Sequence, residues 1–251
     1  MTRHLLILGG TAEAAALAAE LGRRHGNALR VTSSLAGRTE HPAPIAGTVR
    51  IGGFGGADGL EAWLRAEKAD LVVDATHPFA AAISANAVIA CERLGVPRLR
   101  LQRPPWPRHP LDRWVEVETL DAAAHALIQM GSRRAFLTIG AQELAPFARC
   151  GDIWFLVRMI DRPRQPPPLA DFELVLGRGP FSRAEEALLL ARHRIDTLVT
   201  KASGGSATEA KLIAAREMDL PVVMVRRPPP PPGPLVETIA AAVAWVEAIL
   251  A

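Results

Sequence analysis

LLILGGTAEA, residues 5–14, is the stretch that decides the fold of this chain. Its first four residues are large aliphatics without polar alternation, a pattern typical of a strand covered on both faces in a parallel α/β sheet. Gly9 and Gly10 permit a sharp turn close to a ligand, and Thr11 opens an alanine-rich helix that continues to Leu21. Because free N–H groups and the dipole at a helix start attract phosphate, the stretch predicts a nucleotide site.

The glycine pattern nevertheless differs from the dinucleotide fingerprint. That fingerprint is G-x-G-x-x-G, whereas this chain has G-G-T-x-E, with Glu13 as the acidic residue. A tight turn in an α/β protein that binds no nucleotide would use the same glycines. Whether this turn binds a nucleotide therefore depends on the motifs in the rest of the sequence.

Length and composition indicate a cytoplasmic, soluble protein with a substantial core. The 251 residues are 49% hydrophobic, enough for one large or two small domains. Cys91 and Cys150 have no metal-ligand spacing, so we interpret both as reduced packing residues and predict no metal site. No apolar stretch reaches the about 20 residues that span a bilayer, and the N-terminal apolar run is too short for a signal peptide. The net charge of +3 without runs of like charge argues against nucleic acid or a membrane surface as partner.

Arginine dominates the basic residues. Only three of the 29 lysines and arginines are lysines. The planar guanidinium suits carboxylate and phosphate, which favours an anionic ligand. A genome rich in G and C would produce the same bias, and both explanations stay open.

The end of the second predicted strand, residues 29–34, bears on the choice of cofactor. Ser33 lies at this end, Arg38 and Thr39 follow, and no acid appears before Glu40. An acid at this place holds the ribose of NAD, whereas an arginine with hydroxyl neighbours accommodates the 2'-phosphate of NADP. The pattern therefore favours NADP, unless Arg38 is an ordinary loop arginine.

Further turns follow the next strands of the first half. The glycine-rich run 52–56 follows one strand, and the segment 77–79 follows the buried run 71–76. Because the carboxyl ends of parallel strands meet at one edge, we expect these turns beside the first one. His77 would lie at this edge, although a lone histidine there is more often a capping residue. The residues expected at the edge are Gly9, Gly10, Ser33, Gly52, Gly53, Thr76, His77 and Pro78.

A proline-rich connector, residues 104–110, predicts a boundary between a first domain of residues 1–104 and a second of residues 111–251. Beyond it the alternation of strands and helices starts again. A helix is expected to begin near Ala141, and residues 235–250 predict an amphipathic terminal helix after the extended spacer 228–232.

The best site of the second half is LVTKASGGSATE, residues 198–209. It repeats the design of residues 5–14, a buried strand, a small-residue turn and a helix, and Lys201 adds a cationic donor. It is not a P-loop, because the lysine precedes the glycines, and a purely structural turn is the alternative. Arg158 and Arg178 lie at the ends of other strands, where they would receive carboxylates from a ligand or from the protein itself. The donors of the turn are Lys201, Ser203, Gly204, Gly205 and Ser206.

Taken together, the blocks give the chain a family resemblance. They are LGGTAE at 8–13, SLAGR at 34–38, GGFGG at 52–56, DATHPFA at 74–80, GRGPF at 177–181 and KASGG at 201–205. In this order the set resembles the precorrin-6A reductase family of cobalamin biosynthesis. The resemblance implies two Rossmann-like domains with mainly parallel sheets and an active site between them. It also implies NADPH-dependent reduction of precorrin-6A to precorrin-6B, in which a hydride and a proton reach two carbons of a tetrapyrrole rich in acetate and propionate groups.

With that activity in view, we hypothesise that the first half holds NADPH. Gly9, Gly10, Thr11 and Glu13 would lie at the pyrophosphate turn, and Ser33, Arg38 and Thr39 would lie at the 2'-phosphate. Residues 201–206 would bind the tetrapyrrole, with Arg158 and Arg178. The chain has no tyrosine, so the proton donor is Lys201, His77 or water, and we favour Lys201.

Two rival functions remain open from the sequence. One is the related reductase that acts on the cobalt-bearing substrate, which no residue separates from the metal-free case. The other is a non-catalytic sensor that binds a dinucleotide without oxidising it. The sequence also leaves open the oligomeric state and the half on which the terminal helix packs.

Overall fold

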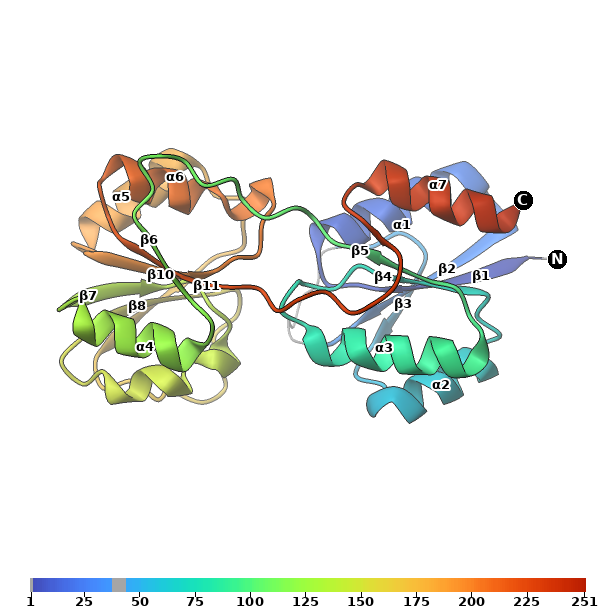
Figure 1. Cartoon of the computed structure of the whole chain (residues 1–251), viewed down its shortest axis with the longest axis horizontal. Helices are drawn as coiled ribbons and strands as arrows, with labels where there is room; N and C mark the ends of the chain where they lie inside the picture. The colour runs from blue at the N-terminus through green and yellow to red at the C-terminus, as the bar shows by residue number, and fades with distance from the viewer. Residues whose placement is uncertain (1, 38–43) are drawn as a thin grey trace. The chain divides into compact units, whose positions relative to one another are not determined.

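The computed structural model describes residues 2–37 and 44–251. The chain forms two compact units, one of Met1–Pro104 with Pro228–Ala251 and one of Pro105–Arg227. Each unit is a parallel sheet with helices on both faces (Figure 1), so the α/β class expected from the sequence is confirmed.

The described strands of the first unit all run parallel in the order β12-β5-β4-β1-β2-β3. This is the order of a dinucleotide-binding Rossmann sheet, with β12 in the sixth place. Residues 5–8 of β1 are at most 1% exposed, which confirms the burial on both faces predicted for LLIL. Leu5 and Ile7 face α1 and α7, and Leu6 and Leu8 face α2 and α3. The strands are β1 (Arg3–Leu8), β2 (Leu29–Leu35), β3 (Thr48–Ile51), β4 (Leu71–Asp74), β5 (Arg98–Leu101) and β12 (Leu235–Val236), and the helices are α1 (Ala12–His25), α2 (Gly56–Ala66), α3 (Ala81–Leu94) and α7 (Ile239–Leu250).

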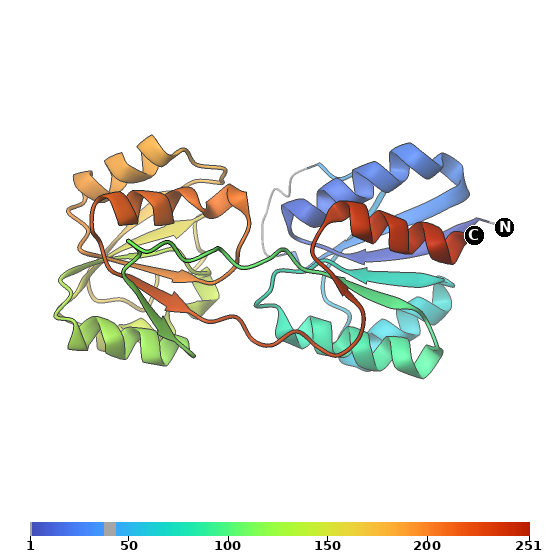
Figure 2. The same cartoon turned by 45° about the horizontal axis from the view of Figure 1, so that its top comes forward.

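The C-terminal segment belongs to the first unit, which corrects the expected second domain of residues 111–251. β12 pairs with β5, and α7 lies beside α1 in both Figure 1 and Figure 2. The reason is apolar packing: Val243 and Val246 of α7 are buried in the same cluster as Leu17 and Leu21 of α1. The second unit therefore ends at Arg227.

The described strands of the second unit are also parallel, in the order β6-β11-β10-β7-β8-β9. Helices α5 and α6 pack together on one side, and α4 packs with the short 3-10 helix η3. The helix expected near Ala141 is replaced by two 3-10 turns, η2 and η3, and Pro146 in the first turn of η3 lacks the N–H that a continuous helix needs. The strands are β6 (Trp114–Val117), β7 (Arg134–Leu137), β8 (Trp154–Met159), β9 (Phe172–Leu176), β10 (Thr197–Lys201) and β11 (Val222–Val225), the helices are α4 (Leu120–Gln129), α5 (Arg183–Arg192) and α6 (Ala210–Glu217), and the 3-10 turns are η2 (Ala141–Glu143), η3 (Ala145–Arg149) and η4 (Ser206–Thr208).

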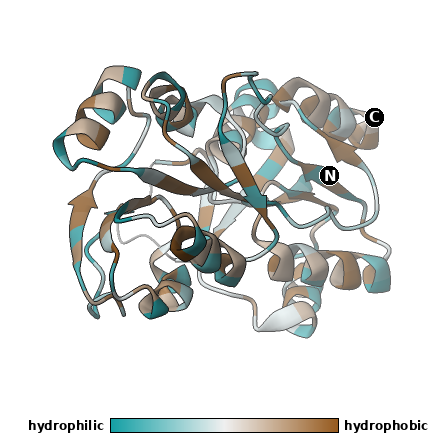
Figure 3. Cartoon of the chain, turned by 60° about the vertical axis from the view of Figure 1, so that its left-hand side comes forward, coloured by the Kyte–Doolittle hydropathy of each residue, from teal (hydrophilic) through white to brown (hydrophobic). Residues whose placement is uncertain are grey.

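Apolar residues gather in the strands, which Figure 3 shows mostly in brown. Cys91 and Cys150 are free and buried, as expected of packing residues, and burial raises the pKa of the Cys91 thiol to about 12. Across residues 2–37 and 44–251, no helix combines the length and the apolar character that crossing a membrane requires.

His4 of β1 is a buried titratable group at the amino edge of the first sheet. Its Nε2 lies 2.8 Å from Thr32 Oγ1, and Arg30 Nη2 lies 2.6 Å from its Nδ1. The same Nδ1 lies 3.0 Å from Glu67 O, so it faces both a donor and an acceptor. Burial lowers the pKa of His4 below its ordinary value, and the nearby Arg30 charge acts in the same direction.

This environment predicts a loss of stability on acidification. In the unfolded chain His4 binds a proton as the pH falls through about 6.5, while the folded form binds it only at lower pH, so the free energy of unfolding decreases below about 6.5. The contribution of one such proton cannot exceed about 1.4 kcal/mol per pH unit. Urea unfolding at pH 7.5 and 5.5 is expected to show a larger loss for the wild type than for His4→Gln, which cannot titrate. Equal losses in the two proteins would contradict this account.

Candidate functional site

The carboxyl edge of the first sheet has its topological switch point between β1 and β4. The chain leaves β1 through α1, which packs with α7, and leaves β4 through α3, which packs with α2 on the other face. In open α/β sheets, ligands bind at such a crevice between strand ends. The structure thus brings Gly9, Gly10 and Thr11 to the same place as the turn at residues 75–78, as the sequence predicted.

The turn between β1 and α1 is shaped for close approach of a ligand. Gly10 has a φ of +99°, and a Cβ at this position would meet no described atom within 4 Å. Thr11 caps α1 by accepting a bond from Ala14 N at 3.1 Å, and its hydroxyl donates to Ala75 O at 2.8 Å. Among the described residues, the N–H groups of Ala12 and Glu13 have no acceptor, so the helix start offers two donors to an anion.

Glu13 enters this turn as a charge that is already paired. Its Oε2 lies 2.7 Å from Nη1 of Arg103, a residue of the segment that follows β5. The pair neutralises a carboxylate that would otherwise repel phosphate at the start of α1. We therefore propose that Glu13 links the start of α1 to the segment after β5 through Arg103 and does not contact phosphate directly.

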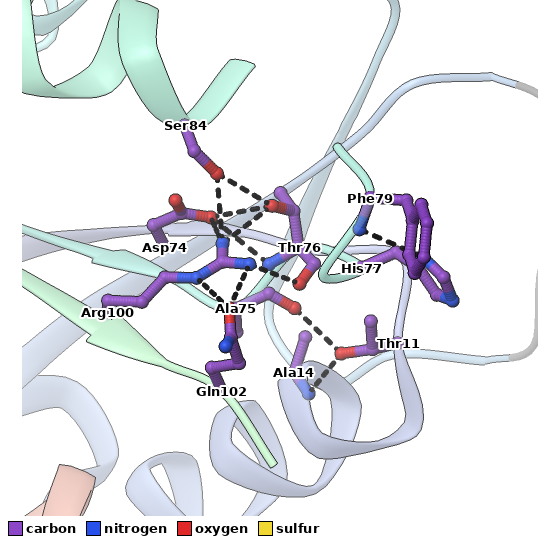
Figure 4. A network of polar contacts seen from close by, with 10 residues as sticks. All are labelled: Thr11, Ala14, Asp74, Ala75, Thr76, His77, Phe79, Ser84, Arg100 and Gln102. Atoms are coloured by element: carbon purple, nitrogen blue, oxygen red, sulfur yellow. Dashed lines mark hydrogen bonds and ion pairs between the residues drawn. The ribbon is translucent and has the colours of Figure 1, made fainter. Parts of the chain in front are cut away.

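A buried polar network fixes the turn after β4 (Figure 4). Arg100 of β5 is 2% exposed and Asp74 of β4 is fully buried, and Arg100 Nη1 lies 2.6 Å from Asp74 Oδ1. The same Nη1 donates to Thr76 Oγ1 at 2.8 Å and to Ser84 Oγ at 3.0 Å, and Nη2 donates to Thr76 O at 3.2 Å. Thr76 is thereby held through both its side chain and its carbonyl. Asp74 Oδ2 has no hydrogen-bond partner among the described residues.

His77 lies in the turn that this network holds and is only partly buried. Phe79 N donates to His77 Nδ1 at 3.3 Å, so the neutral ring carries its proton on Nε2. The ring of Phe79 lies beside it, with the centroids 5.8 Å apart. His77 and its neighbour Pro78 therefore lie at the predicted edge.

The ends of β2 and β3 contain the other predicted cofactor residues. Ser33 is 2% exposed, and its Oγ has no partner among the described residues, so its hydroxyl does not face solvent. Gly52 and Gly53 follow β3, and their carbonyls accept bonds from Arg50 at 2.5 and 2.8 Å. Arg50 was not among the residues predicted at this edge. Arg38 and Thr39 lie outside the described residues.

In the second unit, Lys201 ends β10 at the switch point between β7 and β10. Its Nζ lies 2.6 Å from Glu143 Oε2, an atom that also accepts a bond from Gly140 N at 3.1 Å. Glu143 comes from the η2 turn after β7 and was missed by sequence reasoning. The pair fixes a partly buried ammonium at the carboxyl edge, where a ligand is expected.

The turn after Lys201 has the backbone that its glycines predict. Gly204 and Gly205 have φ of +66° and +83°, and Trp106 Nε1 donates to Gly205 O at 2.7 Å. Ser203 is 8% exposed, and Ser206 opens the short η4 turn before α6. The structure thus brings residues 201–206 together at one edge of the sheet.

Arg158 and Arg178 differ in what the structure shows of them. Both terminal nitrogens of Arg158 bind Glu186, at 2.6 and 2.9 Å, and its guanidinium lies 4.0 Å from the centre of the Phe181 ring. Glu186 is 1% exposed, so this is a buried pair within the protein, the alternative that the sequence left open. Arg178 lies in the loop between β9 and α5, as predicted. We assign Arg158 to holding that loop.

Comparisons with known proteins match this geometry. The family model described as "Precorrin-6x reductase CbiJ/CobK" matches residues 4–247. The chain is 51% identical over 247 residues to a precorrin-6A reductase of Rhodococcus erythropolis, covering 98% of both chains. It is 28% identical to a cobalt-precorrin-6A reductase of Salmonella typhimurium, with 89% of this chain and 87% of that protein covered. A solved structure titled "CobK precorrin-6A reductase" superposes with a TM-score of 0.93 at 42% identity, covering 99% of this chain and 97% of the other.

Proposed function

Because the chain belongs to the precorrin-6x reductase CbiJ/CobK family, we propose that it reduces precorrin-6A to precorrin-6B in cobalamin biosynthesis with NADPH as reductant. The observation that carries the activity is the likeness to a solved precorrin-6A reductase over 99% of this chain, which includes both units. We assign the dinucleotide to the switch point of the first unit and the tetrapyrrole to that of the second.

The edge of the first sheet fits a dinucleotide. Gly10 leaves room beside the backbone, and the N–H groups of Ala12 and Glu13 are available to a pyrophosphate. Thr11 and the Asp74–Arg100 network hold the two flanking turns, so the site is rigid before a ligand binds. When bound, NADPH would supply the hydride.

The edge of the second sheet supports a site for a poly-acid substrate. Lys201 provides a cation, and the tight turn that follows it contains Gly204, Gly205 and the hydroxyl residue Ser206. Arg178, in the loop after β9, adds a second cation of this unit. Acetate and propionate groups bind such donors by charge-assisted hydrogen bonds.

Lys201 is our proposed proton donor. An ammonium carries a transferable proton, and the Glu143 carboxylate at 2.6 Å restrains Nζ in one position. His77, with its Nε2 proton, is the second candidate within the chain, and water is the third. With Lys201 as the donor, the protein supplies both the proton and the orientation.

The metal-free substrate is favoured over the cobalt-bearing one. Identity to the Rhodococcus erythropolis precorrin-6A reductase is 51%, against 28% to the Salmonella typhimurium cobalt-precorrin-6A reductase. We expect faster turnover of precorrin-6A than of its cobalt complex under the same conditions, and the reverse order would overturn this choice.

Consumption of NADPH tests the proposal as a whole. Mixing the protein with precorrin-6A and NADPH is expected to oxidise one NADPH for each precorrin-6B formed, followed by absorbance and by mass spectrometry of the product. A sensor would bind NADPH and leave it reduced. Binding without oxidation, in the presence of intact precorrin-6A, would therefore refute the reductase assignment.

A further inference from the structure

Arg50 is a cation at the carboxyl edge of the first sheet that the site described above does not use. It lies in the edge strand β3, in register with Ser34 of β2, so its backbone is next to the end of the second strand. In a Rossmann sheet, the end of the second strand is where the adenosine ribose of a dinucleotide binds. Arg50 thus lies beside the expected 2'-position.

The guanidinium of Arg50 is fixed in one orientation. Its Nη1 donates to Gly52 O at 2.5 Å and to Ser34 Oγ at 3.4 Å, and its Nη2 donates to Gly53 O at 2.8 Å. The group also lies 3.8 Å from the centre of the Phe54 ring, a cation–π contact. These contacts leave the Nε hydrogen and one Nη2 hydrogen without an acceptor among the described residues. Such a fork matches two oxygens of a phosphate.

The charge of Arg50 is not compensated by a carboxylate. Among the described arginines of the first unit, only Arg50 and Arg98 form no ion pair. Arg98 begins β5, is 9% exposed, and donates to Pro232 O, so it is buried at the opposite end of its strand from the carboxyl edge. Residues 33–37 and 48–57 contain no acid that could hold a ribose hydroxyl or neutralise Arg50.

From this arrangement we propose that Arg50 binds the 2'-phosphate of the dinucleotide and thereby selects NADP over NAD. The inference rests on the proposed function and assigns to Arg50 a role that sequence reasoning gave to Arg38. Ser33 is too buried to share this contact through its hydroxyl as the fold stands. The fork of Arg50 accepts the phosphate, while Phe54 and the two glycine carbonyls keep it in place.

Binding of NADP⁺ and NAD⁺ to the whole protein, measured by titration calorimetry, tests this role without turnover. Arg50→Met is expected to weaken NADP⁺ binding by about 10- to 100-fold, the effect of losing charge-assisted hydrogen bonds, and to leave NAD⁺ binding unchanged. Arg50→Lys keeps the charge and loses the fork, so its NADP⁺ affinity should be intermediate. Arg30→Met is the matched control, because it removes the same charge from the amino end of β2 and should alter neither affinity.

Three outcomes would overturn the inference. NADP⁺ binding by Arg50→Met within twofold of the wild type would remove Arg50 from the phosphate site. Equal weakening of both dinucleotides in Arg50→Met and Arg50→Lys would show that Arg50 only supports the turn at residues 52–53. Equal affinities of the wild type for NADP⁺ and NAD⁺ would show that the protein does not select between the two dinucleotides. A wild type that binds neither would instead refute the cofactor assignment of the proposed function.

Discussion

Lys201→Met is expected to lower kcat for precorrin-6A reduction by about 10²- to 10⁴-fold, the range for loss of a general acid. The methionine has a similar length but carries no proton to give. The hydride would then reach one carbon of the tetrapyrrole without a donor to protonate the other. NADPH binding should be unchanged, because Lys201 ends a strand of the second unit and the proposed cofactor site is in the first. Stopped-flow oxidation of NADPH at saturating substrate measures the effect.

Two companion variants separate proton donation from charge. Lys201→Arg retains a cation that can pair with Glu143, but a guanidinium does not release its proton at accessible pH, so kcat should stay low. Glu143→Gln removes the charge that restrains Nζ and should lower kcat by about 10-fold with a smaller effect on KM. Recovery of wild-type turnover in Lys201→Arg would mean that Lys201 acts as a charge only. His77→Gln would then be the variant expected to lose the proton step.

The turns of both sites could be predicted because their signals are local in sequence. Gly10 and Gly204 have positive φ, a conformation that the neighbouring glycine and the following helix start already indicate. Buried runs such as residues 5–8 identify central strands, and the carboxyl ends of parallel strands necessarily meet at one edge. Local pattern and sheet geometry together therefore located both candidate edges.

The partners of the site residues could not be predicted because they come from distant parts of the chain. Glu143 is 58 residues from Lys201, and no pattern in either segment refers to the other. For Arg158, the sequence could not show whether its partner is a carboxylate of a ligand or of the protein. In the structure that partner is Glu186. A charged residue inside a buried run, as in RLRL of β5, is the one signal that could have drawn attention to Arg100.

The place of the terminal helix shows a similar limit. The amphipathic pattern of residues 235–250 predicts a helix with one buried face, which α7 has from Ile239 onward. The first residues of that range form strand β12 instead of helix. The pattern does not say which sheet that face covers, because both units offer apolar strands. In the folded chain, α7 covers the first sheet because it packs against α1. The two helices lie more than 200 residues apart in sequence.

Arg100→Met is expected to destabilise the first unit by about 3–5 kcal/mol, the cost of breaking a buried ion pair from one side. Asp74 would remain fully buried with a charge and no counterion, and Thr76 would lose the donors to its hydroxyl and its carbonyl. Hydrogen exchange of the β1 and β4 amides measures this loss in the first unit. The amides of β7 and β10 in the second unit provide an internal reference, because unfolding of the whole chain is not expected to be two-state.

A double-mutant cycle separates the charge from the loss of packing. Asp74→Asn/Arg100→Met removes both charges, so it should be more stable than Arg100→Met alone, because no uncompensated charge stays buried. Arg98→Met is the matched control on the same strand: it also removes a buried arginine, but one that binds a carbonyl and no carboxylate. If the double variant were as unstable as the sum of the two single variants, the ion pair would carry no coupling energy.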